Sequence, residues 1–288
     1  MKQLAQEEIN MFTMTPSPNM TVRKEKTGRV SLLVLSPKKP KANAPGILWI
    51  HGGGYILGMK EMVYISRAAA LVEKYGAVVV SPGYRLAFQK PYPAAIDDCY
   101  LALLWMKEHA KDLGINPRQL MVGGESAGGG LCAALCMMAR DQGEVNIAWQ
   151  MPLYPMIDNF DTDSSKDNHG RVWNTRRNHL GWRMYLRRNA KKAVSPYAAA
   201  ARETDFAGLP PAYTFVGDGE PFYSETLAFI KALQDAGIPA EVDVYPTNVH
   251  AFDILKPELE ISKQAIQRFE EHFQYAAEHY FTECEANG

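Results

Sequence analysis

Short apolar runs alternate along this chain with longer segments whose apolar residues recur at helical spacing. The runs fit β-strands, and the longer segments between them fit helices of 15 to 24 residues. This alternation predicts a mostly parallel sheet covered by helices on both faces, and therefore an α/β fold. The expected strands are residues 30–35, 46–50, 77–80, 119–122, 147–153, 213–216 and 240–245, and the expected helices are 59–75, 94–109, 126–140, 222–236 and 257–280.

The length and charge of the chain limit the kinds of protein it can be. Its 288 residues suit one large α/β domain or two small ones. Hydrophobic residues make up 47% of the chain and the formal net charge is -1, which argues against disorder as the main state. The balanced charge also argues against a nucleic-acid-binding protein of the basic-patch kind.

The compartment follows from what the N-terminus and the cysteines lack. The opening residues MKQLAQEEIN carry no apolar signal core, and the apolar run 131–139 is far too short to span a membrane. The four cysteines form no CxxC pair, so we expect reduced, mostly buried thiols at Cys99, Cys132, Cys136 and Cys284. These features predict a cytoplasmic protein without a transmembrane segment.

Two segments interrupt the alternation. The first covers about residues 1–30, and the second, about 158–195, is an insertion between two expected strands. The insertion opens with acidic residues and then carries eight basic residues with no acid between them: Arg171, Arg176, Arg177, Arg183, Arg187, Arg188, Lys191 and Lys192. Apolar residues at helical spacing inside it indicate a helix. The insertion is either a solvent-exposed helical segment outside the main fold or a lid over an active site at the sheet edge.

The pentapeptide Gly124-Glu125-Ser126-Ala127-Gly128 is a GxSxG motif between an expected strand and an expected helix. This is the context in which the motif places a serine on a sharp turn with its Oγ exposed. The following helix N-terminus favours negative charge near that oxygen. The pattern therefore predicts Ser126 as a nucleophile.

The glycine run His51-Gly52-Gly53-Gly54 directly follows the expected strand 46–50. Glycines allow a loop whose backbone N–H groups turn inward, where they stabilise the oxyanion of an acyl-transfer intermediate. We expect the N–H groups of Gly53, Gly54 and Ala127 to form this oxyanion hole. For His51 itself a structural role is the more natural expectation.

A nucleophilic serine needs a histidine base and an acid that orients it. His250 follows the expected strand 240–245, in a loop at the strand end where a catalytic base can lie. The acid should follow the strand 213–216, and both Asp218 and Glu220 stand there. The residue pattern alone does not decide which of these two carboxylates is the acid of the triad.

With these motifs in order, the chain resembles the hormone-sensitive-lipase-like carboxylesterase group of the α/β-hydrolases from about residue 46 to its end. The resemblance rests on HGGG at 51–54, YRLA at 84–87, YPAA at 92–95, GESAGG at 124–129, SPY at 195–197 and GLPP at 208–211. It implies an α/β-hydrolase fold in which a helical cap covers a mostly parallel sheet flanked by helices. The chain departs from the family pattern at Phe88, where proline is frequent, and at Thr247, where glycine is frequent.

The resemblance also bears on the acid and on the cap. The family places its acid directly before Pro-Leu or Pro-Phe, usually as aspartate, and Glu220 holds that position here, with Asp218 as the alternative. It implies one domain over residues 1–288, with a cap made of about 1–30 and about 158–195. The cap residues that could line a substrate pocket are Met11, Phe12, Met14, Trp173 and Trp182.

The expected chemistry is hydrolysis of short- to medium-chain carboxylic esters through an acyl-enzyme on Ser126, with His250 and Glu220 completing the triad. This reaction needs no metal or organic cofactor, and its partner is a small-molecule ester rather than a nucleic acid. An amidase or arylformamidase on the same triad, and a receptor for small ligands with the same fold, are the alternatives. A homodimer is compatible with the sequence.

Overall fold

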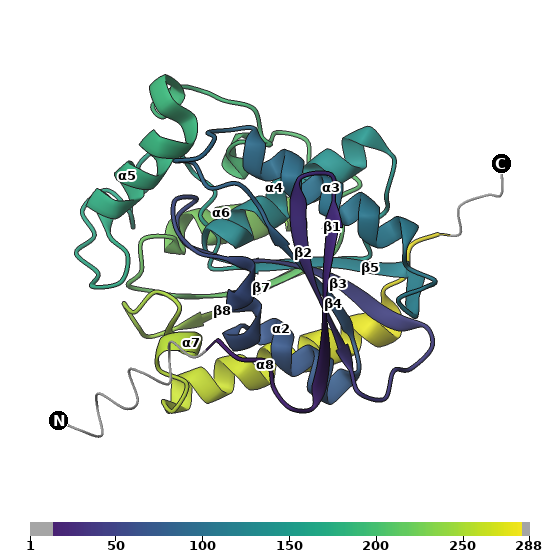
Figure 1. Cartoon of the computed structure of the whole chain (residues 1–288). Coiled ribbons are helices and arrows are strands. Elements are labelled where there is room, and N and C mark those ends of the chain that lie inside the picture. Colours follow the sequence, from purple (N-terminus) through teal and green to yellow (C-terminus); the bar gives the residue numbers. More distant parts are fainter. Residues whose placement is uncertain (1–13, 284–288) are drawn as a thin grey trace.

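The computed structural model describes residues 14–283 and contains one eight-stranded sheet (Figure 1). The strand order is β1-β2-β4-β3-β5-β6-β7-β8, and the pairings β1–β2 and β2–β4 are antiparallel while the remaining pairings are parallel. The strands are β1 (Met20–Thr27), β2 (Val30–Pro37), β3 (Ala44–Ile50), β4 (Val78–Gly83), β5 (Ile115–Glu125), β6 (Trp149–Leu153), β7 (Ala212–Gly217) and β8 (Ala240–Tyr245).

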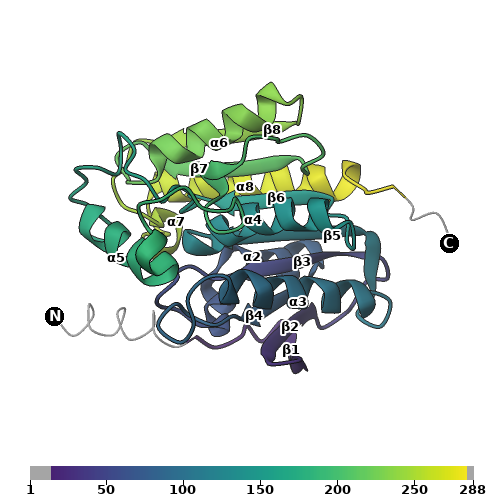
Figure 2. The ribbon, with the colours of Figure 1, turned by 90° about the horizontal axis from the view of Figure 1, so that it is seen from above.

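Helices cover both faces of this sheet, as Figure 2 shows from above. One face carries α3 (Ala94–Glu108), α4 (Ala127–Gln142) and α6 (Tyr223–Asp235), and the other carries α2 (Arg67–Ala70) and α8 (Glu260–His279). Alternate residues of β3 enter the two cores: Leu48 packs on the α3–α4 side and Trp49 on the α8 side. Burial on both faces explains why the central strands read as continuous apolar runs.

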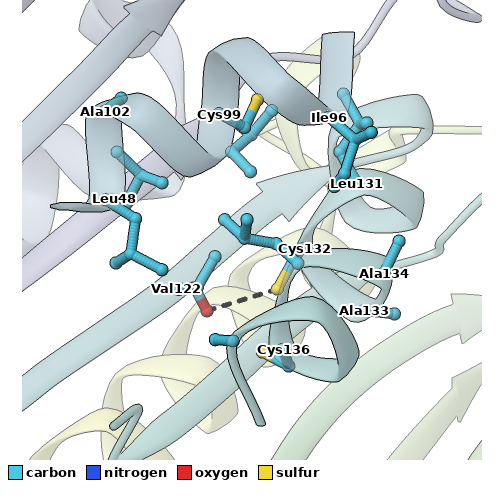
Figure 3. Packing of buried hydrophobic residues seen from close by; sticks show 14 of the residues in the cluster. Leu48, Ile96, Cys99, Ala102, Val122, Leu131, Cys132, Ala133, Ala134 and Cys136 are labelled. Carbon is cyan, nitrogen blue, oxygen red and sulfur yellow. Dashed lines mark hydrogen bonds between the residues drawn. The ribbon is translucent and has the colours of Figure 1, made fainter. Parts of the chain in front are cut away.

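The core between β3, β5, α3 and α4 is built from small and medium side chains (Figure 3). Leu48 and Val122 of the strands face Cys99 of α3 and Cys132 of α4, and the Cys132 thiol donates to Val122 O at 3.3 Å. Cys99, Cys132 and Cys136 are buried free thiols, which confirms the expectation for these three. Cys284 lies outside the described residues.

The N-terminal segment contains a strand that the sequence pattern did not indicate. β1 pairs with β2 through a turn at Gly28, which has a φ of 53°. Its outward positions are polar and it lies at the sheet edge, so it carries little of the apolar signal that identifies central strands. Residues 20–27 thus extend the sheet, and only the chain ahead of them is available for a cap. Met11 and Phe12 lie outside the described residues.

Two helical segments also differ from the expected pattern. The continuous helix expected over 59–75 is divided into η1 (Lys60–Ile65), α2 and the π-helical turn η2 (Leu71–Tyr75). Ser66 is extended between the first two and its Oγ accepts from Ala68 N at 3.1 Å, so it ends one segment and caps the next. The short helix α7 (Phe252–Leu255), just after His250, was not expected.

The insertion between β6 and β7 contains the helix that its apolar spacing predicted. This helix, α5 (Thr175–Leu186), buries Trp182, Tyr185 and Leu186 and lies at one end of the molecule in Figures 1 and 2. Two short 3-10 turns follow it, η3 (Arg187–Asn189) and η4 (Ala200–Arg202). Among residues 14–283, no helix has the length and apolar character to cross a membrane.

Candidate active site

Ser126 occupies the sharp turn between β5 and α4. Its backbone angles, φ 57° and ψ -119°, are strained for a residue with a side chain. The end of β3 approaches this turn closely. A Cβ placed on Gly128 would lie 2.0 Å from Ile50 O, and one placed on Gly124 would lie 2.5 Å from the same atom. Glycines at both positions let the strained serine be held by the surrounding backbone.

The structure brings Ser126, His250 and Glu220 together in one hydrogen-bonded relay. His250 Nε2 lies 2.9 Å from Ser126 Oγ, and His250 Nδ1 bonds to Glu220 Oε2. The three side chains come from the ends of β5, β8 and β7, and all are buried. The remaining Glu220 oxygen, Oε1, accepts from Gly217 N at 2.9 Å, so both carboxylate oxygens have partners.

Asp218, the alternative acid, lies elsewhere. Its side chain is exposed and accepts from Thr247 N at 3.1 Å, within the turn that links the β7 and β8 loops. A contact between Asp218 and the imidazole of His250 is not found in the described structure. The geometry therefore favours Glu220 and gives Asp218 a role in the turn.

Two aromatic rings enclose the imidazole of His250. Tyr154 and Phe222 meet it edge to face, with ring centroids 5.1 Å and 5.0 Å away. Tyr154 has a φ of 33°, and its hydroxyl donates to Asp253 Oδ1 at 2.9 Å, which fixes the ring. Neither Tyr154 nor Asp253 was expected from the sequence, because neither belongs to a motif that requires a particular residue type.

Buried ionisable side chains lie close to the nucleophile turn. Glu125, next to Ser126, accepts from Trp49 Nε1 at 2.9 Å, while Arg67 Nε lies 3.1 Å from Asp253 Oδ2. Burial raises the pKa of Glu125 to about 8, and the nearby Asp253 carboxylate adds to this rise. Burial likewise raises the pKa of Asp253, against the opposing effect of the Arg67 charge. This group supports the turn but contacts neither Ser126 Oγ nor the His250 nitrogens in the described structure.

The glycine loop after β3 lies against the nucleophile turn. A Cβ on Gly52 would be 3.3 Å from Ser126 Cβ, and Gly53 and Gly54 adopt φ values of 115° and 60° that favour glycine. Within residues 14–283 the N–H groups of Gly53 and Gly54 donate no backbone hydrogen bond. Ala127 is the first residue of α4, where an N–H has no acceptor inside the helix. These three donors are available to a bound oxyanion.

His51 has a structural role, as expected. It is 2% exposed, stacks on Tyr84 at 4.2 Å, and its Nδ1–H donates to Gly52 O at 2.8 Å. The Tyr84 hydroxyl donates to His51 O at 2.9 Å, so the residue ties the glycine loop to the segment after β4. Burial lowers the pKa of His51 to about 4.

The buried neutral His51 should make the protein sensitive to acid. In the unfolded chain it takes up a proton near pH 6.5, whereas the folded chain resists protonation down to about pH 4. The free energy of unfolding should therefore fall by about 3 kcal/mol from this group as the pH drops from 6.5 to 4. Urea unfolding at several pH values checks this, with His51→Gln losing that part of the slope. An unchanged slope in the variant would rule out the assignment.

The insertion contacts the loops on two sides of this site. Trp173 packs on the glycine loop, since a Cβ on Gly54 would lie 2.1 Å from its ring. Tyr185 of α5 stacks on Tyr55, just after the loop, at 4.2 Å. On the other side, Asn168 Nδ2 donates to Gly219 O at 3.1 Å, beside Glu220. Segment 158–195 thus contacts both the glycine loop and the β7 loop.

Comparison with known proteins places this architecture among esterases. The family described as having the alpha/beta hydrolase fold matches residues 47–254. Carboxylesterase NlhH of Mycobacterium tuberculosis is 32% identical over 228 residues, covering 77% of this chain and 71% of NlhH. The arylesterase of Saccharolobus solfataricus is 31% identical over 224 residues, covering 76% and 71%.

A solved structure agrees with these relatives. The bacterial heroin esterase superposes with a TM-score of 0.86 at 28% identity, covering 96% of this chain and 90% of that one. The fold class and the resemblance inferred from the HGGG and GESAGG motifs are thereby confirmed. The chain belongs to the α/β-hydrolase family, within its hormone-sensitive-lipase-like carboxylesterase group.

Proposed function

We propose that this protein is a serine carboxylesterase that hydrolyses esters of short- to medium-chain carboxylic acids, with Ser126, His250 and Glu220 as its triad. The observation that carries the proposal is the buried relay from Glu220 through His250 to Ser126 Oγ. A ligand receptor of the same fold has no need of an intact relay. The carboxylesterase and esterase relatives support the same reaction.

The geometry supports a two-step acyl transfer. Ser126 Oγ attacks the ester carbonyl carbon while His250 Nε2 takes its proton, and the Glu220 carboxylate holds Nδ1–H and stabilises the imidazolium. His250 then protonates the leaving alcohol. A water molecule, deprotonated by His250 in turn, attacks the acyl-enzyme and releases the acid.

The oxyanion formed in each step has three available donors. The N–H groups of Gly53 and Gly54 come from the glycine loop, and that of Ala127 comes from the start of α4. Such donors are fixed before the reaction and stabilise charge that develops only in the transition state. The positive end of the α4 dipole acts in the same direction.

We further propose that residues 1–288 form a single domain whose cap consists of segment 158–195 and the chain ahead of β1. The contacts of Trp173 with Gly54 and of Asn168 with Gly219 support the cap role of the insertion. A cap in this position would limit the size of the acyl and alcohol groups that reach Ser126.

The test separates ester from amide hydrolysis. Purified protein is assayed with p-nitrophenyl esters from acetate upward and with the matching p-nitroanilides. We expect turnover of the esters, highest for the short and medium chains, and at most weak turnover of the anilides. Preferential turnover of anilides would instead assign an amidase, and inactivity on both series would favour a receptor.

A further inference from the structure

The insertion contains a cavity of about 1030 Å³ that is distinct from the proposed active site. All its lining residues fall between 159 and 191, and none belongs to the relay or to the glycine loop. It lies between the chain after β6 and the helix α5, at the end of the molecule where α5 is seen in Figures 1 and 2. Its volume is at the upper end of the range for small-molecule sites.

One face of α5 supplies much of the wall. Thr175, His179 and Trp182 recur at the spacing of a single helix face, and Arg176 and Arg183 flank them. Trp182 is buried, and Phe160, which also lines the cavity, is 38% exposed. The wall therefore combines two aromatic side chains with guanidinium groups.

Most of the charge on this wall is positive. Four of its cations form no ion pair with any residue that the structure describes: Arg176, Arg183, Arg188 and Lys191. Its two further cations have partners, since Lys166 Nζ lies 2.6 Å from Asp163 Oδ1 and Arg187 Nη2 donates to Ala87 O at 3.3 Å.

Two carboxylates, Asp161 and Asp167, also line the wall, fewer than its six Lys and Arg side chains. Asp161 Oδ1 lies 2.6 Å from His179 Nε2, and Asp167 Oδ1 lies 3.1 Å from His169 Nε2. Both carboxylates are thus engaged by imidazoles of the same cavity. The four cations without an ion pair are exposed and share this concave surface, where positive charges outnumber negative ones.

Like charges gathered in a concave surface repel one another and focus a positive potential. A ligand with several negative groups relieves this repulsion at many points at once. Guanidinium groups suit phosphate and carboxylate, because they bind both by paired N–H···O bonds. We propose that this cavity, the basic cleft, binds a small molecule that carries two or more phosphate or carboxylate groups.

Isothermal titration of the full-length protein at low ionic strength tests the proposal. Inorganic tripolyphosphate and citrate serve as the two probes, one for phosphate and one for carboxylate chemistry. The double variant Arg176→Gln/Arg183→Gln removes two charges from the basic cleft. Its matched control, Arg29→Gln/Arg171→Gln, removes two exposed arginine charges that do not line it.

We expect the unmodified protein to bind at least one probe with 1:1 stoichiometry. The cleft variant should bind that probe at least tenfold more weakly, and the control within about twofold of the unmodified protein. Preference for tripolyphosphate assigns the phosphate class, and preference for citrate assigns the carboxylate class. Thermal melting confirms that both variants fold.

Two results would overturn the proposal. One is the absence of binding of either probe at millimolar concentration. The other is an equal loss of affinity in the cleft and control variants, which indicates attraction to overall charge. Neither result depends on esterase activity, so this test and the test of the proposed function can fail independently.

Discussion

Ser126→Ala is expected to lower kcat for a p-nitrophenyl ester by about 10⁵- to 10⁶-fold. The variant keeps the oxyanion donors and the His250–Glu220 pair but removes the oxygen that attacks the carbonyl carbon. The measurement is steady-state release of p-nitrophenol under conditions that saturate the unmodified enzyme. Removing the side-chain oxygen should leave the thermal melting temperature nearly unchanged, because Ser126 Oγ contacts only His250 in the described relay.

Ser262→Ala is the matched control for that variant. Ser262 is also buried, and its hydroxyl donates to Phe252 O at 3.2 Å, on the α8 side of the sheet. This variant loses a buried hydroxyl as well, but it should retain kcat within a few-fold. If Ser126→Ala kept more than a tenth of the activity, Ser126 would not be the nucleophile.

Glu220→Gln is expected to lower kcat by about 10⁴-fold, whereas Asp218→Asn should change it less than about fivefold. A glutamine at 220 can present an N–H to His250 Nδ1, which favours the wrong imidazole tautomer, and it cannot stabilise the imidazolium. Asp218 contacts Thr247 N instead and bears only on the turn. The measurement is kcat for the same ester in both variants.

The two variants serve as controls for each other. Both replace a carboxylate by the isosteric amide, and the two positions are only two residues apart. A larger loss in Asp218→Asn than in Glu220→Gln would transfer the acid role to Asp218. Comparable losses in both would show that the turn, rather than one carboxylate, determines the position of His250.

The sequence predicted the parts of the fold and site that depend on local backbone requirements. The strained turn at Ser126 and the positive φ values at Gly53 and Gly54 require particular residue types at fixed spacing, so the motifs identify them. The central strands were also predicted, because burial on both faces makes them apolar throughout. β1 was not, since an edge strand can be polar on its outward side.

Side-chain contacts between distant segments were beyond the reach of the sequence pattern. The residues alone did not decide whether Asp218 or Glu220 is the acid of the triad. The answer depends on which carboxylate reaches His250 Nδ1. Tyr154, Asp253 and Arg67 come from three separate elements, and their meeting beneath the site follows from packing alone. The eight basic residues of the insertion were visible in the sequence, but the cavity that gathers some of them was not.

Covalent labelling with a fluorophosphonate, followed by mass spectrometry of the digested protein, tests whether Ser126 is the activated nucleophile. The probe reacts with a serine only where a base activates it and an oxyanion hole receives the phosphonyl oxygen. We expect a single adduct per chain, on the peptide that contains Ser126, and no adduct in Ser126→Ala. An adduct on another residue, or an unlabelled protein that still hydrolyses esters, would contradict the assignment of Ser126 as the nucleophile.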